Sequence, residues 1–169
     1  KKVLVTGGAG FIGSHVVEAL LDREAYVRVV DKLKKEEAAN LLGVIDHIEY
    51  LNLDLINPQE ALQAAEGIEI VLNLAAKVGG IDYNRLHQAT MFRENILIAV
   101  NMLESANVNK AERFLTVSTA CVYPRFCKMP IPETEGFVDI PEPTNGGYGW
   151  AKRMAEYAQK VVKNPSLAE

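Results

Sequence analysis

The sequence has little cysteine and no long apolar run. Cys121 and Cys127 are the two cysteines among 169 residues, too few for a disulfide framework, so we expect free thiols in a reducing compartment. No apolar stretch approaches the roughly 20 residues of a membrane-spanning helix. Lys1 and Lys2 precede only a few apolar residues, too few for the core of a signal peptide. We therefore expect a cytoplasmic protein without a membrane segment.

A strong excess of charge is also missing. With 18 basic and 22 acidic residues, the formal net charge is only −4. This balance argues against a general affinity for nucleic acid or for an anionic membrane surface. No internal repeat or low-complexity tract stands out, and we predict no metal ligands. An anionic ligand would have to be held by local backbone geometry, because the overall charge does not attract it.

The residues that are present suit a soluble α/β domain. Hydrophobic residues make up 49% and charged residues 24% of a chain long enough for a real core. Strand-like and helix-like segments alternate, which predicts α/β architecture with a parallel, doubly wound sheet. The expected strands cover residues 3–5, 26–30, 48–53, 69–74 and 113–118, and the expected helices cover 14–23, 58–66, 92–107 and 149–162.

A glycine-rich stretch separates the first strand from the first helix. It reads Thr-Gly-Gly-Ala-Gly-Phe-Ile-Gly, with Gly7, Gly10 and Gly13 in G-x-x-G-x-x-G spacing. Gly7 allows a sharp turn, Gly10 leaves room for a pyrophosphate, and Gly13 lets the helix pack closely. The N–H groups of the first helical turn, which includes Phe11 and Ile12, then face an anion. The stretch predicts a Rossmann fold that binds a dinucleotide.

In this strand–turn–helix context, residues 6–13 resemble the extended short-chain dehydrogenase/reductase family, whose members mostly act on nucleotide sugars. The resemblance implies one NAD(P)-binding Rossmann domain over residues 1–169. Family enzymes continue past this point into a smaller C-terminal domain for the sugar nucleotide. We therefore expect the N-terminal part of a longer enzyme, with a truncated binding module as the alternative. The family's glycine near residues 22–25 is missing, so the first helix is expected to end with a different cap.

Asp31 bears on the choice of cofactor. It lies 18 residues after Gly13, at the end of the second strand, where an acid accepts hydrogen bonds from the adenosine ribose. The same carboxylate would repel a 2′-phosphate, which favours NAD over NADP. Lys32 is the opposing observation, because a cation there could meet such a phosphate.

The family resemblance implies further cofactor contacts. Asp54 and Leu55 would contact the adenine, although Asp54 could simply form a turn. The small residues after the fourth strand would let the backbone approach the pyrophosphate and ribose. Asn95, at the start of the long central helix, either contacts the cofactor or caps that helix. The remaining expected contacts are Leu74, Ala75, Ala76, Lys77 and Val117.

Tyr148 and Lys152 are the candidate catalytic pair. Their Y-x-x-x-K spacing puts both on one helical face, one turn apart. Removing a hydride from a sugar carbinol needs a base for the hydroxyl proton, and a free phenol with a pKa of about 10 is a poor one. A nearby ammonium and a positive nicotinamide should lower that pKa. Lys152 can also hydrogen-bond the nicotinamide ribose, so both residues count as cofactor contacts.

The resemblance adds a hydroxyl to this pair. In the family it lies four residues before the tyrosine of a Val-Tyr-like pair, here Tyr123, which gives Thr119, with Ser118 as the runner-up. Such a hydroxyl orients the substrate oxygen and stabilises developing charge. The implied triad is Thr119, Tyr148 and Lys152. Residues 124–143 contain five of the seven prolines and are expected to form a long active-site loop.

Two stretches narrow the resemblance. Residues 75–81 and 120–124 are similar to GDP-L-fucose synthases, and the Ala-Cys-x-Tyr-Pro pattern is similar to GDP-mannose 3,5-epimerases. In both, a cysteine aligned with Cys121 moves protons during epimerisation, which suits a thiol pKa of about 8.5. The alternative is a small buried cysteine. Gly79 and Gly80 would form a tight loop near the sugar.

The sequence thus predicts an NAD-dependent nucleotide-sugar epimerase that works through transient hydride transfer and a keto sugar. Asp31 departs from fucose synthases, which generally prefer NADP. A fucose-synthase-like reductase using NADP is one alternative, and a 4-epimerase or 4,6-dehydratase is another. A non-catalytic dinucleotide-binding module is the alternative of a different class. Homodimers formed through the central helix and the Tyr–Lys helix are common among relatives and are expected here.

Overall fold

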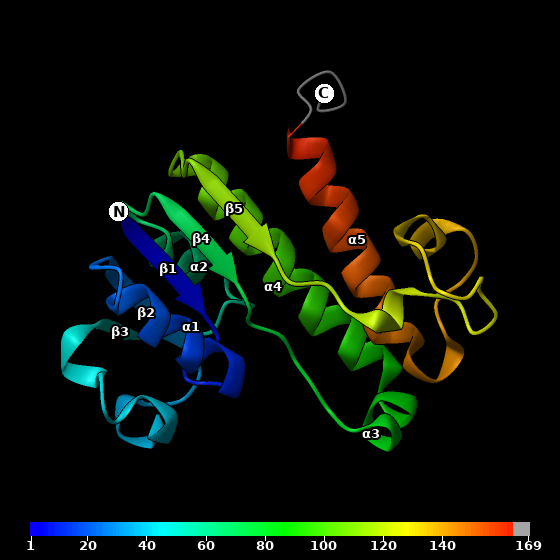
Figure 1. Ribbon diagram of the computed structural model, residues 1–169, viewed down its shortest axis with the longest axis horizontal. Helices are drawn as coiled ribbons and strands as arrows, with labels where there is room; N and C mark the ends of the chain where they lie inside the picture. The colour runs from blue at the N-terminus through cyan, green and yellow to red at the C-terminus, as the bar shows by residue number, and fades with distance from the viewer. Residues whose placement is uncertain (164–169) are drawn as a thin grey trace. The chain divides into compact units, whose positions relative to one another are not determined.

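The computed structural model describes residues 1–163. The chain divides into two compact units. Unit 1 comprises residues 1–75 and 101–117, and unit 2 comprises residues 76–100 and the chain from 118 onward. Figure 1 labels the helices and strands of both units. Among the described residues, no helix has both the length and the apolar character needed to cross a membrane.

Unit 1 is built on a five-stranded sheet in which every neighbouring pair is parallel. The strand order is β3-β2-β1-β4-β5, with β1 in the middle (Figure 1). This confirms the predicted doubly wound sheet, and it is the strand order of a Rossmann fold. The strands are β1 (Lys2–Thr6), β2 (Tyr26–Asp31), β3 (Glu49–Asn52), β4 (Ile70–Asn73) and β5 (Arg113–Thr116).

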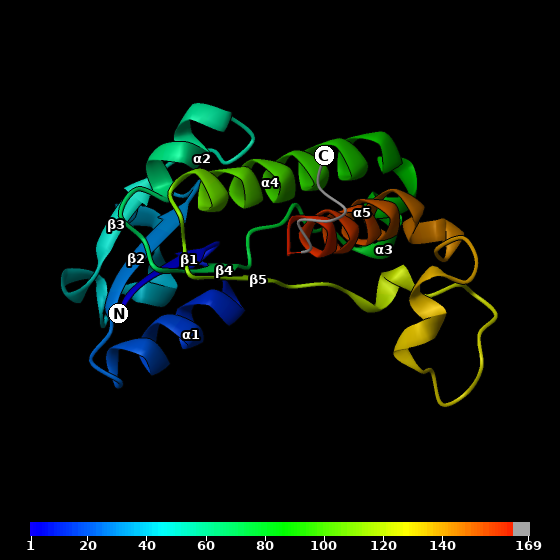
Figure 2. The ribbon, with the colours of Figure 1, turned by 90° about the horizontal axis from the view of Figure 1, so that it is seen from above.

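Helices cover both faces of this sheet. Figure 2 shows α1 (Phe11–Leu21) on one side of the strands and α2 (Pro58–Ala64) on the other. The expected cap of α2 is confirmed, because the Asn57 side chain accepts a hydrogen bond of 3.0 Å from the Gln59 N–H and Pro58 opens the helix. Helix α1 begins three residues earlier than expected, directly after Gly10.

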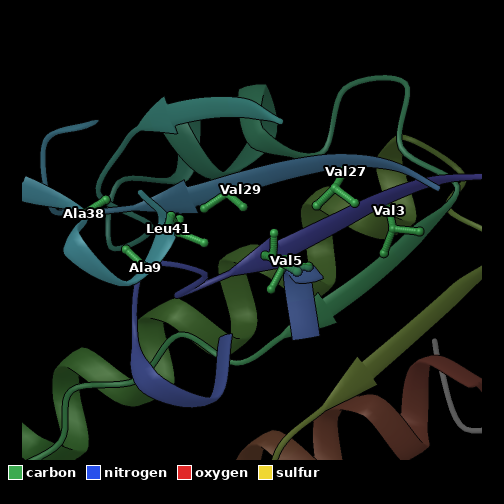
Figure 3. Packing of buried hydrophobic residues seen from close by; sticks show 8 residues of the cluster. Val3, Val5, Ala9, Val27, Val29, Ala38 and Leu41 are labelled. Carbon is green, nitrogen blue, oxygen red and sulfur yellow. The ribbon is translucent and has the colours of Figure 1, made fainter. Parts of the chain in front are cut away.

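The core of unit 1 is made by alternate residues of β1 and β2 (Figure 3). Val5 and Val29 are fully buried, and Leu4 on the opposite face of β1 is fully buried as well. A central parallel strand is covered on both faces, which explains the continuous apolar run in β1. Ala38 and Leu41, from the short 3₁₀ helices between β2 and β3, close this part of the core.

The end of α1 shows what replaces the missing glycine. Glu24 adopts a left-handed conformation with φ of 56°, and its N–H and that of Ala25 bond to the Leu21 and Leu20 carbonyls. This is the position where glycine is usually found, because it has no Cβ to clash. A glutamate can adopt this conformation at a cost of about 1 kcal/mol.

Unit 2 is mainly helical. It contains α3 (Ile81–Leu86), the first part of α4 (Gln88–Val108) and α5 (Gly146–Lys163). Both long helices begin a few residues earlier than predicted, and α3 was not predicted because six residues carry too little periodicity. Residues 124–143 are largely irregular, as expected, with one 3₁₀ helix at Glu133–Phe137. Two further 3₁₀ turns, η4 (Ala120–Val122) and η6 (Pro143–Asn145), flank this loop.

Candidate functional site

The glycine loop of unit 1 turns sharply out of β1. Gly7 has a φ of +65°, and its N–H donates to the Val30 carbonyl at 2.8 Å. The Gly10 N–H then donates to the Gly7 carbonyl at 3.1 Å, which closes the turn before α1. A side chain at Gly7 would be strained by the left-handed backbone and would meet the Ala75 backbone at 3.0 Å. The loop is therefore held in one shape between β1, β2 and the end of β4.

Gly13 brings α1 into contact with this loop. A Cβ atom at Gly13 would lie 2.3 Å from the Gly7 carbonyl oxygen and 2.7 Å from the Gly8 Cα atom. Both are backbone atoms, so the clash could be relieved only by moving the helix or the loop. The first intrahelical bond runs from the Ser14 N–H to the Gly10 carbonyl at 2.9 Å. The N–H groups before it have no acceptor within the helix.

Those N–H groups belong to an exposed first turn. The Phe11 and Ile12 residues are 74% and 64% exposed, and the first turn contains no acidic residue. A helix N-terminus of this kind carries partial positive charge and favours an anion. The electrostatics of unit 1 at this point therefore suit a phosphate group.

Asp31, at the end of β2, is bonded to the glycine loop. Its Oδ2 atom accepts from the Ala9 N–H and its Oδ1 atom from the Leu33 N–H, each at 3.1 Å. The Asn40 side chain donates to the Ala9 carbonyl at 2.9 Å and holds the same loop from another segment. Each carboxylate oxygen has a second lone pair for a ligand. The expected contact with a ribose stays a prediction, whereas support of the loop by Asp31 is observed.

Lys32 forms an ion pair with another candidate residue, Asp54. Their Nζ and Oδ2 atoms are 3.3 Å apart, on side chains that are 60% and 41% exposed. Asp54 Oδ1 also accepts from the Ile56 N–H at 3.1 Å, so the turn-forming interpretation of Asp54 is correct as well. Leu55 is only 4% exposed, which leaves little of its side chain for the expected contact with an adenine face.

Buried polar groups join the ends of β1 and β4. Thr6 Oγ1 donates to Asn73 Oδ1 at 2.7 Å and accepts from the Ala75 N–H at 3.0 Å. Asn73 is 4% exposed, and its carbonyl accepts from the Val117 N–H at 3.3 Å. Leu74 and Ala75 follow β4 and are half-buried. These contacts fix the backbone at the carboxyl edge of the sheet, where ligands bind in folds of this kind.

In unit 2, Asn95 holds the segment that contains Ala76 and Lys77. Its side chain accepts from the Lys77 N–H at 2.9 Å and donates to the Lys77 carbonyl at 3.0 Å. It also donates to the Met91 carbonyl at 2.8 Å and is buried. Because α4 begins at Gln88, the expectation of an N-terminal cap is wrong. Asn95 lies in the second turn and binds the backbone of Lys77.

Gly79 and Gly80 lead into α3. A Cβ at Gly79 would lie 2.7 Å from the Tyr83 ring, whereas one at Gly80 would meet nothing within 4 Å. The Asn84 side chain donates to Asn145 Oδ1 at 2.9 Å, just before α5 begins. This bond ties α3, and the glycine pair before it, to the segment that leads to Tyr148.

Tyr148 and Lys152 lie on α5, one turn apart. The Lys152 Nζ atom is 5.7 Å from the centre of the Tyr148 ring, and Lys152 is only 7% exposed. Burial, and to a lesser extent a negative charge on Cys121, raises the pKa of Tyr148 above its ordinary value. Burial lowers the pKa of Lys152, and the charge of Glu156 acts in the opposite direction. The lowering of the Tyr148 pKa expected from an ammonium together with a positive nicotinamide stays a prediction, because in the chain on its own burial raises that pKa.

Cys121 belongs to the turn η4, Thr119 is the N-cap residue of that turn, and α5 packs against it. Thr119 Oγ1 accepts from the Cys121 N–H at 3.2 Å, so the hydroxyl caps this turn and keeps its proton for another acceptor. A Cβ at Gly149 would lie 2.4 Å from the Cys121 carbonyl oxygen. The absence of a side chain at Gly149 thus lets η4 approach the helix turn that carries Tyr148. Unit 2 brings together the two candidate segments, although their catalytic role stays a prediction.

Three further residues of unit 2 were not singled out by sequence analysis. Gly147 allows α5 to touch α4, because a Cβ there would lie 2.1 Å from the Gln88 carbonyl oxygen. Arg153 is 2% exposed, and its Nε atom donates to the Val122 carbonyl at 2.8 Å. Glu156 accepts a hydrogen bond from Ser118, the runner-up for the catalytic hydroxyl. The i, i+4 spacing from Lys152 would have indicated that Glu156 lies on the same face of the helix. No pattern in the sequence indicates the burial of Arg153.

The candidate residues are therefore divided between the units. Unit 1 contains the glycine loop, Asp31, Lys32, Asp54, Leu55, Leu74, Ala75 and Val117. Unit 2 contains Ala76, Lys77, Gly79, Gly80, Asn95, Thr119, Cys121, Tyr148 and Lys152. Within residues 1–163, no cluster of three or more histidine, cysteine, aspartate or glutamate side chains is arranged to hold a metal ion.

Comparison with known proteins shows the family of the chain. The profile of the NAD dependent epimerase/dehydratase family matches residues 3–164. GDP-mannose 3,5-epimerase 1 of Oryza sativa subsp. japonica is 34% identical over 128 residues, covering 76% of this chain and 33% of that protein. The probable GDP-L-fucose synthase of Drosophila melanogaster is 31% identical over 156 residues, covering 92% of this chain and 44% of that protein.

A solved structure shares the fold. The UDP-glucose 4-epimerase of Thermus thermophilus in complex with NAD aligns with a TM-score of 0.82 and 28% sequence identity. The alignment covers 98% of this chain and 51% of the other. The chain thus spans about a third to a half of the length of these proteins.

Proposed function

The chain belongs to the NAD dependent epimerase/dehydratase family, and we propose that it is the NAD-binding domain of a nucleotide-sugar epimerase. The observation that carries this proposal is the arrangement in unit 2 of Tyr148 and Lys152 on α5, with Thr119 and Cys121 in the adjoining turn η4. A base, a cation that favours its ionised form and a hydroxyl suit the oxidation of a sugar carbon, and a thiol suits proton transfer at a neighbouring carbon.

The residues of unit 1 fit a dinucleotide. The exposed first turn of α1 offers N–H groups to a pyrophosphate, and the glycine at position 10 leaves the approach to them open. Asp31 has lone pairs for ribose hydroxyls, and Lys32 is paired with Asp54. Two carboxylates and one ammonium leave an excess of negative charge, which disfavours a 2′-phosphate. When bound, an oxidised nicotinamide supplies the hydride acceptor and a positive charge.

In this mechanism the chain's own residues transfer protons and orient the sugar. The Tyr148 phenolate takes the proton of the sugar hydroxyl and becomes a phenol, and the Lys152 ammonium favours the phenolate form. The hydroxyl of Thr119 donates to the sugar oxygen, because its own hydrogen bond to Cys121 uses only a lone pair. Oxidation leaves a ketone, which acidifies the neighbouring C–H bonds. Cys121 removes or returns a proton at such a carbon, and Gly79 and Gly80 border the sugar.

Replacing Cys121 with serine tests the proton transfer. We expect C121S to lose epimerisation by roughly a hundredfold or more while it still binds NAD, because a serine hydroxyl is a far weaker acid than a thiol. The measurement is incorporation of deuterium from D₂O into GDP-mannose by the full-length, NAD-loaded enzyme. Cys127→Ser is the matched control, since Cys127 lies in the irregular loop at residues 124–132 and should leave the rate unchanged. A normal rate in C121S would contradict the role of the thiol.

Replacing Asp31 tests the choice of cofactor. In D31N the carboxylate charge is lost, so we expect the ratio of NAD to NADP affinity to fall by about tenfold, equivalent to about 1.4 kcal/mol. Because Asp31 also supports the glycine loop, a loop defect would weaken both dinucleotides equally and leave the ratio unchanged. Calorimetric titration with each dinucleotide measures the ratio. Asp46→Asn is the control, on a side chain that is 89% exposed.

The activity itself is tested with the full-length protein, NAD and GDP-mannose or UDP-glucose. Deuterium at a sugar carbon next to the oxidised centre supports the epimerase. The second candidate is a GDP-L-fucose-synthase-like reductase, favoured by the relative that aligns over 92% of the chain. It would consume NADPH in the presence of a GDP-linked keto sugar. Dinucleotide binding without turnover of any of these substrates would instead favour a non-catalytic module.

A further inference from the structure

Two neighbouring cations on α5 are buried. Lys152 is 7% exposed and Arg153 is 2% exposed. Burying a charged group is costly unless an opposite charge or hydrogen-bond acceptors compensate for the lost water. The Arg153 guanidinium donates to the Val122 carbonyl and lies 5.2 Å from the centre of the Trp150 ring. A carboxylate on the same face of the helix adds to the compensation of the buried Lys152 charge.

Glu156 is placed to provide that compensation. It follows Lys152 by four residues and Tyr148 by eight, so the three side chains form one stripe along α5. The Ser118 hydroxyl donates to Glu156 Oε1 from the segment that precedes η4. The carboxylate is half-buried and anchored from outside its own helix. Its position is therefore set by tertiary structure and not by a free side-chain rotation.

The charges around this stripe are few. Tyr148 lies on the N-terminal side of Lys152, and Cys121 in η4 acts on Tyr148. Arg153 feels the charges of Asp139 and Glu156, whereas the carboxylate that acts on Lys152 is Glu156. Burial and Glu156 have opposite effects on the pKa of Lys152. The balance between them decides over what pH range the lysine is charged.

We propose that Glu156, anchored by the Ser118 hydroxyl, is a positioning residue that holds the buried Lys152 ammonium as its counter-ion beneath Tyr148. The inference rests on the proposed function, because it assigns Glu156 a part in the same Tyr–Lys chemistry. It also gives Ser118 a different task from Thr119. Ser118 orients the carboxylate, which leaves the substrate oxygen to the Thr119 hydroxyl.

Glu156→Gln removes the charge and keeps an acceptor for Ser118. The pKa of a cation falls when its counter-ion is lost, so Lys152 should lose its proton at a lower pH in E156Q. We expect the alkaline limb of the kcat/KM profile of the NAD-loaded enzyme with GDP-mannose to move down by about one pH unit. On the acid side of the profile, E156Q should stay within about twofold of the wild type. A purely structural role would reduce activity at every pH.

A second measurement does not depend on activity. Titration of the ¹³C-labelled Lys152 side chain by NMR in the full-length, cofactor-free protein, identified by its loss in Lys152→Met, should show the same downward shift in E156Q. Glu104→Gln, on an exposed residue of α4, is the matched control and should move neither readout. Ser118→Ala should give a smaller shift in the same direction. The downward shift of the Lys152 pKa in the double variant S118A/E156Q should be no larger than in E156Q, since both substitutions act through one carboxylate.

The outcomes separate the two proposals. An unchanged Lys152 titration in E156Q, or an equal shift in E104Q, would overturn the role of Glu156 whether or not the protein turns over a nucleotide sugar. A shifted titration in a protein that turns over none of the tested sugars would support Glu156 and count against the proposed function.

Discussion

Tyr148→Phe is expected to reduce turnover by roughly 10²–10⁴-fold, the usual contribution of a general acid or base. The substitution removes one oxygen atom and keeps the ring, so the packing of the half-buried side chain on α5 is preserved. The Lys152 ammonium lies 5.7 Å from the ring centre and should remain where it is. Affinity for NAD should therefore change by less than about tenfold, while kcat falls. Steady-state kinetics with GDP-mannose and calorimetric titration with NAD measure the two effects.

Tyr157→Phe is the control for this variant. Tyr157 lies on the same helix but is 59% exposed, so removing its hydroxyl should change neither kcat nor NAD affinity. If Y148F and Y157F had equal activity, Tyr148 would not be the base. A loss of kcat together with an equal loss of NAD affinity would instead assign Tyr148 to cofactor binding.

Gly13→Ala is expected to have the largest effect on unit 1. Its Cβ would lie 2.3 Å from the Gly7 carbonyl oxygen and 2.7 Å from the Gly8 Cα atom. These atoms belong to the backbone, so the first turn of α1 and the glycine loop must separate. We expect a destabilisation of about 1–3 kcal/mol, as for other overpacked sites, and a loss of NAD affinity of at least about tenfold. Chemical denaturation and calorimetric titration measure these effects.

Gly43→Ala provides the comparison. A Cβ at Gly43 would meet nothing within 4 Å, so this variant should keep both stability and NAD affinity. Because both substitutions add the same methyl group, the difference between them reports the contact of α1 with the loop. Normal NAD binding by G13A would mean that the glycine loop does not hold the dinucleotide.

Local patterns in the sequence were sufficient for the framework of this protein. Alternating apolar segments predicted the parallel sheet, because a strand buried on both faces is apolar throughout, as in β1. The spacing of Gly7, Gly10 and Gly13 predicted the turn before α1, since Gly7 adopts a left-handed conformation and a Cβ at Gly13 would clash with the loop backbone. Asn57 and Pro58 predicted the start of α2 from capping chemistry alone. Each of these signals acts within a few residues of chain.

Longer-range features were decided by tertiary structure. The sequence predicted a lowered pKa for Tyr148 from the Lys152 ammonium and a bound nicotinamide; in the chain alone, burial raises that pKa, and burial depends on all the segments around Tyr148. Asn95 was expected to contact the cofactor or to cap a helix; it does not cap the helix, and its side chain binds the backbone of Lys77, 18 residues away. Ser118 was the runner-up to Thr119 for the catalytic hydroxyl, and the sequence did not indicate that it donates to Glu156, 38 residues later.

The division follows from how far each interaction reaches along the chain. Helix caps, glycine turns and strand periodicity are set by neighbouring residues, so the sequence by itself determined the fold and the candidate Tyr–Lys pair. Burial, counter-ions and close backbone contacts, such as Gly149 against the Cys121 carbonyl, join residues that are distant in sequence. Only the tertiary structure decided those, because no local pattern records which distant atom will fill the space beside a side chain.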